Sequence, residues 1–344
     1  MTCTENKSET ICWLQRLIGL LFILASLLAG WLWMDYRTVV DAPLRLDHAE
    51  IIEIGKGEPL VSLTRRLGER GILIHPWWFQ LLAWINGDHR HIKYGEYEIP
   101  PGISPRALLA KLTSGKVMQH PVTLVEGRTF AEYLAELENQ PVLDHKLAGL
   151  SAEDIMRRLD APGLAAEGRF FPDTYYVIRG TSDLEVLRRA RRRMSEVLER
   201  EWPARAGDLP YSTPDAALTA ASIVEKETAR PDERPKVAGV IARRLNRNMR
   251  LQMDPTVIYG LGEGFGGDLR KSDLLRDTPY NTYTRTGLPP TPIAMPGLGA
   301  IRAVLHPDEA DSLYFVARGD GSHVFSATLE EHNRAVAQFQ KASP

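Results

Sequence analysis

The longest unbroken hydrophobic stretch of the chain runs from Leu17 to Met34 and contains 18 residues without a charge. At about 1.5 Å per residue, a helix of this length crosses the hydrocarbon core of a bilayer. Trp31 and Trp33 end the stretch, as interfacial anchors do. A signal peptide has a shorter apolar core followed by small residues at a cleavage site, which this end lacks. We predict a retained transmembrane helix over residues 17–34, after a cytoplasmic tail of residues 1–16.

Basic residues do not orient this helix, because each flank carries two of them nearby. Cysteine placement favours one direction. Cys3 and Cys12 both precede the helix, and the chain after it contains none. A reduced cytosolic N-terminus and an exported body without disulfides fit this distribution. We therefore expect the body of the chain outside the cytoplasm.

A linker over residues 35–48 is predicted to lead into a small module over residues 49–118. Hydrophobic spacing in the module alternates between the two-residue period of strands and the three-to-four-residue period of helices. The expected order is a strand at 51–54, helices at 60–70 and 76–85, a strand at 94–99 and a helix at 105–112. The helix at 76–85 contains Trp77, Trp78, Phe79 and Trp84. Its aromatic residues fit a domain core better than a sugar-stacking platform, because leucines lie between them.

A larger domain is predicted over residues 119–344, organised around a helix that starts at Thr213. Thr213 suits the N-cap and Pro214 the first helical position. On the helical period Leu218, Ser222 and Glu225 share one face, so a carboxylate ends an apolar row. A carboxyl group held among apolar neighbours has a raised pKa and suits general acid catalysis. The pattern equally allows a solvated helix end, in which Glu225 faces water.

Other carboxylates and loops give weaker indications. Glu167 and Asp173 form a candidate acid/base pair within a segment predicted as a loop packed onto a core. The segments 280–283 and 287–292 are rigid, turn-forming and dense in hydrogen-bonding groups. Such loops place side chains at little entropic cost.

Composition and charge exclude several classes of function. The chain has 344 residues and a net charge of −2, which gives no electrostatic case for a nucleic-acid partner. Gly262–Gly267 matches a dinucleotide glycine pattern, but no helix opens on it and no strand–helix–strand unit frames it. No acid or cysteine stands at ligand spacing beside His89 and His91. We predict neither a metal nor a cofactor.

Several short motifs follow one another in the body of the chain: Glu167–Tyr175, Ala221–Thr228, Arg244–Asn246, Met249–Gln252, Asp254–Gly260, Tyr280–Tyr283, Gly287–Pro290 and His323–Phe325. Together they resemble the endolytic murein transglycosylase family, of YceG-like type. The membrane helix and the small module, which resembles that family's LysM-like domain, extend the resemblance over nearly the whole chain.

The resemblance implies a bacterial enzyme with a single-pass anchor in the cytoplasmic membrane and a periplasmic catalytic domain. Such an enzyme cleaves nascent peptidoglycan strands internally, at the bond between N-acetylmuramic acid and N-acetylglucosamine, and leaves 1,6-anhydro ends. The family's catalytic glutamate falls on Glu225, which acts without a cofactor. The expected partners are glycan strands, the membrane and cell-wall synthases.

The resemblance also supplies candidates for substrate binding, chosen by their place in the motifs: Glu227, Asp254, Tyr280, Asn281 and Thr282. For each, a structural role is an equal alternative, for example Asp254 as a helix cap and Asn281 as a loop support.

Two other functions remain open: a hydrolase of the same bond that uses Glu225 with Asp254 or Glu227, and a non-catalytic glycan-binding scaffold. The predicted fold is α+β, with a small module and a larger domain behind one transmembrane helix.

Overall fold

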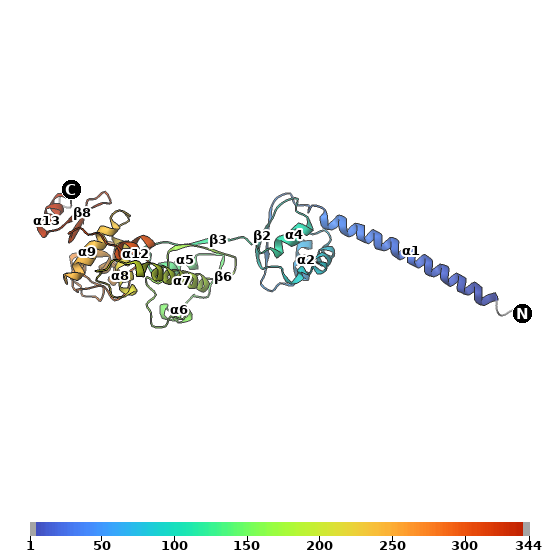
Figure 1. The fold of residues 1–344 in the computed structure, drawn as a ribbon, viewed down its shortest axis with the longest axis horizontal. Helices are drawn as coiled ribbons and strands as arrows, with labels where there is room; N and C mark the ends of the chain where they lie inside the picture. Colours follow the sequence, from blue (N-terminus) through green and yellow to red (C-terminus); the bar gives the residue numbers. More distant parts are fainter. Residues whose placement is uncertain (1–4, 340–344) are drawn as a thin grey trace. The chain divides into compact units, whose positions relative to one another are not determined.

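The computed structural model describes the chain from residue 5 to residue 339, with side chains from residue 13 onward except at residue 263. It forms two compact units, divided between Gln119 and His120, and both mix helices with short strands (Figure 1). The α+β class is therefore confirmed. The predictions made for residues 1–4, including Cys3, lie outside the described chain.

The first unit contains a long N-terminal helix and a small α+β module. Its elements are α1 (Glu5–Asp41), β1 (Glu50–Ile54), α2 (Leu60–Glu69), α3 (Pro76–Ile85), η1 (Asp88–Arg90), β2 (Gly95–Ile99) and α4 (Pro105–Thr113). Strands β1 and β2 pair antiparallel, and α2, α3 and α4 cover a core around Ile52, Leu67 and Tyr97.

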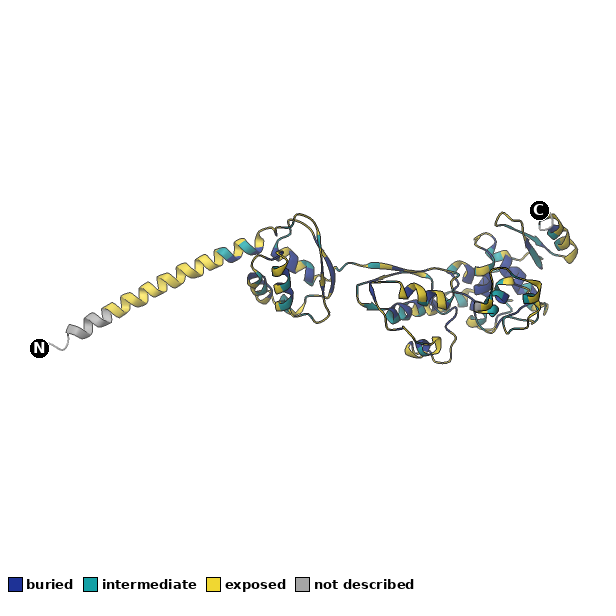
Figure 2. Cartoon of the chain, turned by 180° about the vertical axis from the view of Figure 1, so that it is seen from behind, coloured by how far each residue is buried: buried dark blue, intermediate teal, exposed yellow. Residues whose placement is uncertain are grey.

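Helix α1 is longer than the apolar stretch predicts. Its part from residue 13 to residue 34 is exposed along its whole length (Figure 2). By length and composition, Trp13–Asp41 is the one helix in the described chain able to cross a membrane. The linker predicted at 35–48 is wrong in its first half, because the helix continues to Asp41. Tyr36 and Val40 are buried in the module, which holds these last turns in place.

The prediction that the aromatic residues of α3 form a core is correct for only half of them. Trp78 and Phe79 are buried, but Trp77 is 50% exposed and Trp84 is 63% exposed. The helix is apolar on both faces, and the module covers only one.

The second unit contains the remaining elements: β3 (His120–Leu124), α5 (Phe130–Glu138), β4 (Leu143–Asp144), α6 (Ala152–Arg158), β5 (Asp173–Val177), β6 (Thr181–Ser182), α7 (Asp183–Glu201), η2 (Trp202–Ala204), α8 (Pro214–Glu227), α9 (Arg234–Asn246), α10 (Asp254–Leu261), η3 (Gly262–Gly264), α11 (Lys271–Leu275), α12 (Leu298–Leu305), β7 (Tyr314–Ala317), β8 (His323–Ser326) and α13 (Leu329–Phe339). The pairs β3–β5 and β7–β8 are antiparallel and β4–β6 is parallel. The segment predicted as a loop at 167–175 ends in strand β5, which pairs with β3.

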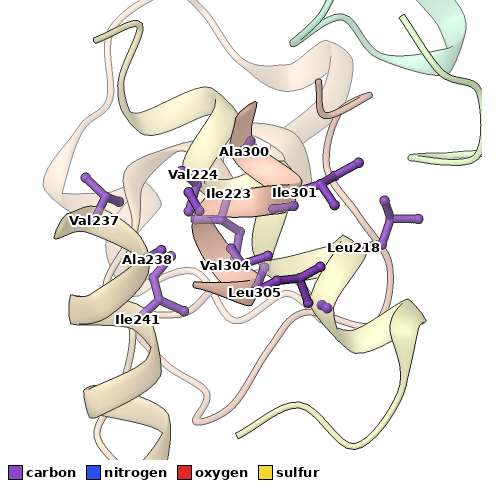
Figure 3. Packing of buried hydrophobic residues seen from close by; sticks show 14 of the residues in the cluster. Leu218, Ile223, Val224, Val237, Ala238, Ile241, Ala300, Ile301, Val304 and Leu305 are labelled. Atoms are coloured by element: carbon purple, nitrogen blue, oxygen red, sulfur yellow. The ribbon is translucent and has the colours of Figure 1, made fainter. Parts of the chain in front are cut away.

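Helix α8 lies at the centre of this unit. All eight residues from Ala217 to Val224 are buried. Residues of α9 and α12 pack against them, as Val224, Ile241 and Val304 illustrate (Figure 3). A helix that is covered on all sides has a fixed position. The residues that follow Val224 are therefore held in place by the core.

Candidate functional site

The helix that carries Glu225 begins and is fixed as the sequence predicts. Thr213 accepts a hydrogen bond from the Ala216 N–H through its Oγ1, at 3.2 Å, and Pro214 is the first helical residue. Farther along, the Ser222 hydroxyl accepts from the Ile293 N–H at 3.0 Å. This bond ties the segment before α12 to the helix, one turn away from Glu225.

Glu225 is enclosed rather than solvated, so the solvated alternative is wrong for this residue. Its side chain is 4% exposed. The Oε1 atom accepts from Arg234 Nη2 at 3.0 Å, and Oε2 accepts from the Gly297 N–H at 2.9 Å. Arg234 is the first residue of α9, and Gly297 is the N-cap of α12. Three helices therefore meet at this carboxyl group.

A second carboxylate shares the same guanidinium. Arg234 Nη2 also lies 3.4 Å from Glu126 Oε1, in the turn after β3. Backbone hydrogen bonds hold this turn: the Gly127 N–H donates to the Met295 carbonyl, and the Lys226 ammonium donates to the Gly127 carbonyl at 3.2 Å. One partly buried cation thus faces two carboxylates.

Two glycines lie where these groups converge. A Cβ on Gly297 would collide with the carboxylate of Glu126 and touch Glu225 Oε2 at 3.4 Å. A Cβ on Gly299 would collide with the guanidinium of Arg234. A side chain at either glycine would therefore push the carboxylate of Glu126 or the guanidinium of Arg234 out of its present position.

The pKa of Glu225 is raised by these surroundings. Burial raises it most, the Gly297 N–H and Arg234 lower it, and Glu126 raises it again. Lys226 also lowers it, so the net rise comes mainly from burial, which disfavours the charged form. At the same time Arg234 and Gly297 stabilise the carboxylate once that proton leaves.

Glu227 lies in different surroundings from Glu225. Burial, followed by the charge of Asp254, raises the pKa of Glu227 to about 8. Among the described residues no hydrogen bond reaches its carboxyl group. Asp254 is exposed at the start of α10 and accepts from the Tyr283 hydroxyl at 2.5 Å. The structure thus brings Glu227, Asp254 and Tyr283 into a second acidic group.

The remaining predicted residues lie in a well-ordered loop. Asn281 is fully buried; its amide donates to the carbonyls of Leu274 and Arg276, and its Oδ1 accepts from the Tyr283 N–H. Thr282 is buried and accepts from the Met253 N–H at 3.0 Å. The polar groups of both side chains are engaged inside the protein, so loop support accounts for them.

Tyr280 is only partly buried. Its hydroxyl is 2.9 Å from Thr291 Oγ1, and its ring packs edge-on against Tyr259 at 4.9 Å between centroids. It links its own loop to the 287–292 loop and to α10.

Glu167 and Asp173 do not form a pair. Asp173 is exposed on β5, where it is bonded to the N–H of its neighbour Thr174. Glu167 is buried and accepts from the Phe130 N–H and the Tyr259 hydroxyl, each at 3.0 Å. Burial raises the pKa of Glu167 to about 7.

Sequence reasoning missed Arg234, Glu126 and Gly297. Arg234 had a readable signal: a cation in the first turn of a helix opposes the helix dipole, which suggests a role outside the helix. The glycines at 297 and 299 flank the start of a helix and could have marked a close approach. Glu126 had no distinguishing signal, because an exposed-looking turn acid is common.

A cavity of about 440 Å³ lies at the other end of α8, near its N-terminus. Asp215, Thr219 and the 288–292 loop line it, and Arg169 makes a two-pronged ion pair there with Asp215. None of the predicted site residues borders this cavity.

Comparison with known proteins places these features in a family context. A family model described as YceG-like matches residues 52–338. The chain is 33% identical over 262 residues to the endolytic murein transglycosylase of Bacillus subtilis (strain 168), covering 71% of this chain and 72% of that protein.

A second relative, the endolytic murein transglycosylase of Streptococcus pneumoniae (serotype 2, strain D39), is 28% identical over 359 aligned residues. That match covers 93% of this chain and 64% of the relative. The crystal structure of a yceG-like protein from Listeria monocytogenes matches with a TM-score of 0.52 and 28% identity, covering 83% of this chain and 99% of the other.

Proposed function

The chain belongs to the YceG-like family, and on that premise we propose that it is an endolytic peptidoglycan lytic transglycosylase with Glu225 as its general acid and base. Relatives named endolytic murein transglycosylases support the activity and the substrate class. The observation that carries the residue assignment is the enclosed carboxyl of Glu225, whose pKa is raised while its carboxylate form has two partners ready.

In the first step, protonated Glu225 gives its proton to the glycosidic oxygen between N-acetylmuramic acid and N-acetylglucosamine. The bond from that oxygen to C1 of the muramic acid breaks, and the N-acetylglucosamine side leaves with a new hydroxyl. Arg234 and the Gly297 N–H stabilise the carboxylate that remains. Positive charge accumulates at C1 and is offset by the nearby acidic groups.

In the second step, the 6-hydroxyl of the same muramic acid attacks C1. The Glu225 carboxylate takes the hydroxyl proton, which restores the acid and produces a 1,6-anhydro end. An intramolecular nucleophile is already positioned, so no second catalytic carboxylate is needed.

Asp254 and Glu227 are proposed to bind sugar hydroxyls, because one is exposed and the other has a carboxyl without a hydrogen-bond partner in the described chain. Tyr280 is proposed to line the substrate path. Asn281 and Thr282 act by holding the loop that carries Tyr283.

A hydrolase is the second candidate, and one observation favours it: Glu126 shares Arg234 with Glu225. In that case Glu126, rather than Asp254 or Glu227, would be the second carboxylate of a muramidase. Mass spectrometry of digested glycan strands separates the two reactions. Anhydro ends support the transglycosylase, and reducing ends contradict it.

Glu225→Gln tests the assignment itself. Loss of general acid catalysis should lower strand cleavage by about 10²–10⁴-fold. The matched control is Glu199→Gln, an exposed change in the same unit, which should leave the rate unchanged. If Glu225→Gln releases fragments as fast as the parent protein, the acid is another residue. If the parent itself releases none, a membrane-tethered glycan-binding scaffold replaces the enzyme.

The anchor and the module complete the proposal. We assign α1 as a single-pass anchor in the cytoplasmic membrane, with the module of the first unit and the whole second unit on the periplasmic side. The module of the first unit is assigned as LysM-like, and cell-wall synthases are the proposed protein partners. Protease accessibility of residues 42–344 in intact spheroplasts tests this orientation, since a cytoplasmic body would stay protected.

A further inference from the structure

Helix α3 carries an apolar face that the protein leaves uncovered. Trp77, Leu81, Trp84 and Ile85 recur at helical spacing and are between 39% and 63% exposed. The opposite face is buried in the module, and the ten residues of the helix contain no charge. A helix that is apolar all round normally lies against something on every side.

The position of α3 indicates what covers this face. In α1, the uncharged stretch ends at Met34, and its length of 18 residues matches a bilayer's hydrocarbon core. The very next residue, Asp35, accepts a hydrogen bond from the Trp78 indole N–H at 3.0 Å. The N-terminal part of α3 therefore lies at the level where α1 leaves the membrane.

A continuous row of aromatic rings joins the two helices. Trp33 contacts Tyr36 at 5.7 Å between ring centroids, Tyr36 contacts Trp78 at 5.2 Å, and Trp78 stacks on Trp77 at 3.5 Å. Trp33 belongs to the end of the apolar stretch and Trp77 to the exposed face of α3. Tryptophan and tyrosine rings gather at the boundary between lipid and water.

We propose that the exposed face of α3 rests in the headgroup layer of the membrane that α1 crosses. The occupant is a phospholipid surface, and the module is bound to that surface rather than held away from it on a free tether. This inference rests on the membrane anchoring proposed above, not on the cleavage reaction. It adds a second membrane contact beyond the single span.

Depth-dependent fluorescence quenching in the full chain tests the proposal. Cys3→Ser and Cys12→Ser remove the native thiols, and an environment-sensitive fluorophore is attached at Trp84→Cys. The protein is reconstituted into phosphatidylcholine–phosphatidylglycerol liposomes with a nitroxide in either the headgroup region or the deep acyl chain. Headgroup nitroxide should quench the label at position 84 several-fold more than the deep nitroxide does.

The matched control is Ile51→Cys on β1. Ile51 is 53% exposed in the same module, but its cross-strand partner is Glu98 and Glu53 lies on the same exposed face. Its label should respond to aqueous iodide and to neither nitroxide. Ile85→Cys repeats the measurement if the change at Trp84 disturbs the module.

Leu27→Cys, within the apolar stretch of α1, separates this inference from the anchor. Deep quenching at 27 with only iodide quenching at 84 and 85 overturns the inference and leaves the anchor standing. Absence of lipid quenching at all three positions overturns both. A label at 84 that neither lipid nor iodide reaches also overturns it, since protein would then cover the face.

Discussion

Two glutamates end helix α8, two residues apart, and their surroundings differ in one decisive respect. Burial raises the pKa of both Glu225 and Glu227. Glu225 also has Arg234 and the Gly297 N–H to stabilise its ionised form. Among the described residues no hydrogen bond reaches the carboxyl group of Glu227, and the charge of Asp254 disfavours its ionised form. Two residues along an α-helix point about 200° apart, so the helix presents each to a different group of side chains.

A raised pKa alone does not make a general acid and base. The group must hold a proton, release it, and be stable as a carboxylate until the second transfer. The surroundings of Glu225 suit the role proposed for it, because burial raises its pKa while Arg234 and the Gly297 N–H stabilise its carboxylate. Glu227 is held in the protonated form near neutral pH, which suits hydrogen bonding to a sugar hydroxyl better than proton transfer.

The largest expected effect is on the rate of strand cleavage. Glu225→Gln should reduce it by about 10²–10⁴-fold, and Glu227→Gln should reduce it by about tenfold or less, mainly through KM. Steady-state kinetics on a defined glycan oligomer give both values. If Glu227→Gln lowered the rate more than Glu225→Gln did, the general acid would be Glu227 and not Glu225.

Arg234 and Glu126 should shift the pH profile in opposite directions. Arg234 lowers the pKa of Glu225 and Glu126 raises it. Activity that needs protonated Glu225 is lost as pH rises through that pKa. Arg234→Gln should therefore move the alkaline limb to higher pH, with a rate loss of about tenfold or more, and Glu126→Gln should move it to lower pH.

The control for this pair is Arg302→Gln, which breaks an exposed ion pair with Glu201 in the same unit. Its pH profile should match that of the parent. If Arg234→Gln and Glu126→Gln both lower the rate without moving the alkaline limb, the cluster acts only as scaffolding. Arg234→Lys should move the alkaline limb less than Arg234→Gln does, because lysine keeps the charge and loses only the fork geometry.

A smaller effect is expected from Gly297→Ala, which changes the packing and no charge. The new methyl group would displace the carboxylate of Glu126 and press on Glu225. Cleavage should fall by roughly tenfold, since small displacements of catalytic groups are costly. Gly207→Ala, where a Cβ meets nothing within 4 Å, is the matched control. Equal rates for the two variants would show that Glu225 tolerates displacement.

Much of the local structure was readable from the sequence. Thr213 and Pro214 mark the start of α8, and the capping box of Thr129 with Glu132 begins α5, because caps and periodicity act over a few residues. The same local signals left α10 and α12 unpredicted. Asp254 and Gly297 suggest turns as readily as helix starts.

Only part of the site could be predicted from the sequence, for a related reason. The motif resemblance points to Glu225, but its partners come from places 99 residues before it and 72 after it, at Glu126 and Gly297. Periodicity indicates which residues share one helix face, but it does not indicate which distant segment of the sequence covers that face. The burial of Trp77 and Trp84 on α3 was predicted wrongly for the same reason. Apolar residues at helical spacing give the same pattern whether the helix face is buried or exposed.

The smallest expected effect is the change in thermal stability that Glu227→Gln causes. The pKa of Glu227 is 4.5 when unperturbed and about 8 in the fold, so the folded state binds more protons between these values. Its contribution to stability is full below about pH 4.5 and is lost as pH rises towards 8.

Glutamine does not ionise, so the stability of the Glu227→Gln variant does not fall with pH for this reason. At pH 8 the variant should melt several degrees above the parent, and at pH 5 the difference should be much smaller, because most of the loss accumulates between these two pH values. Calorimetry at the two pH values measures the difference, with Glu199→Gln expected to change neither. A variant less stable than the parent at pH 8 would mean that Glu227 is ionised and paired in the fold, which would remove the contrast with Glu225.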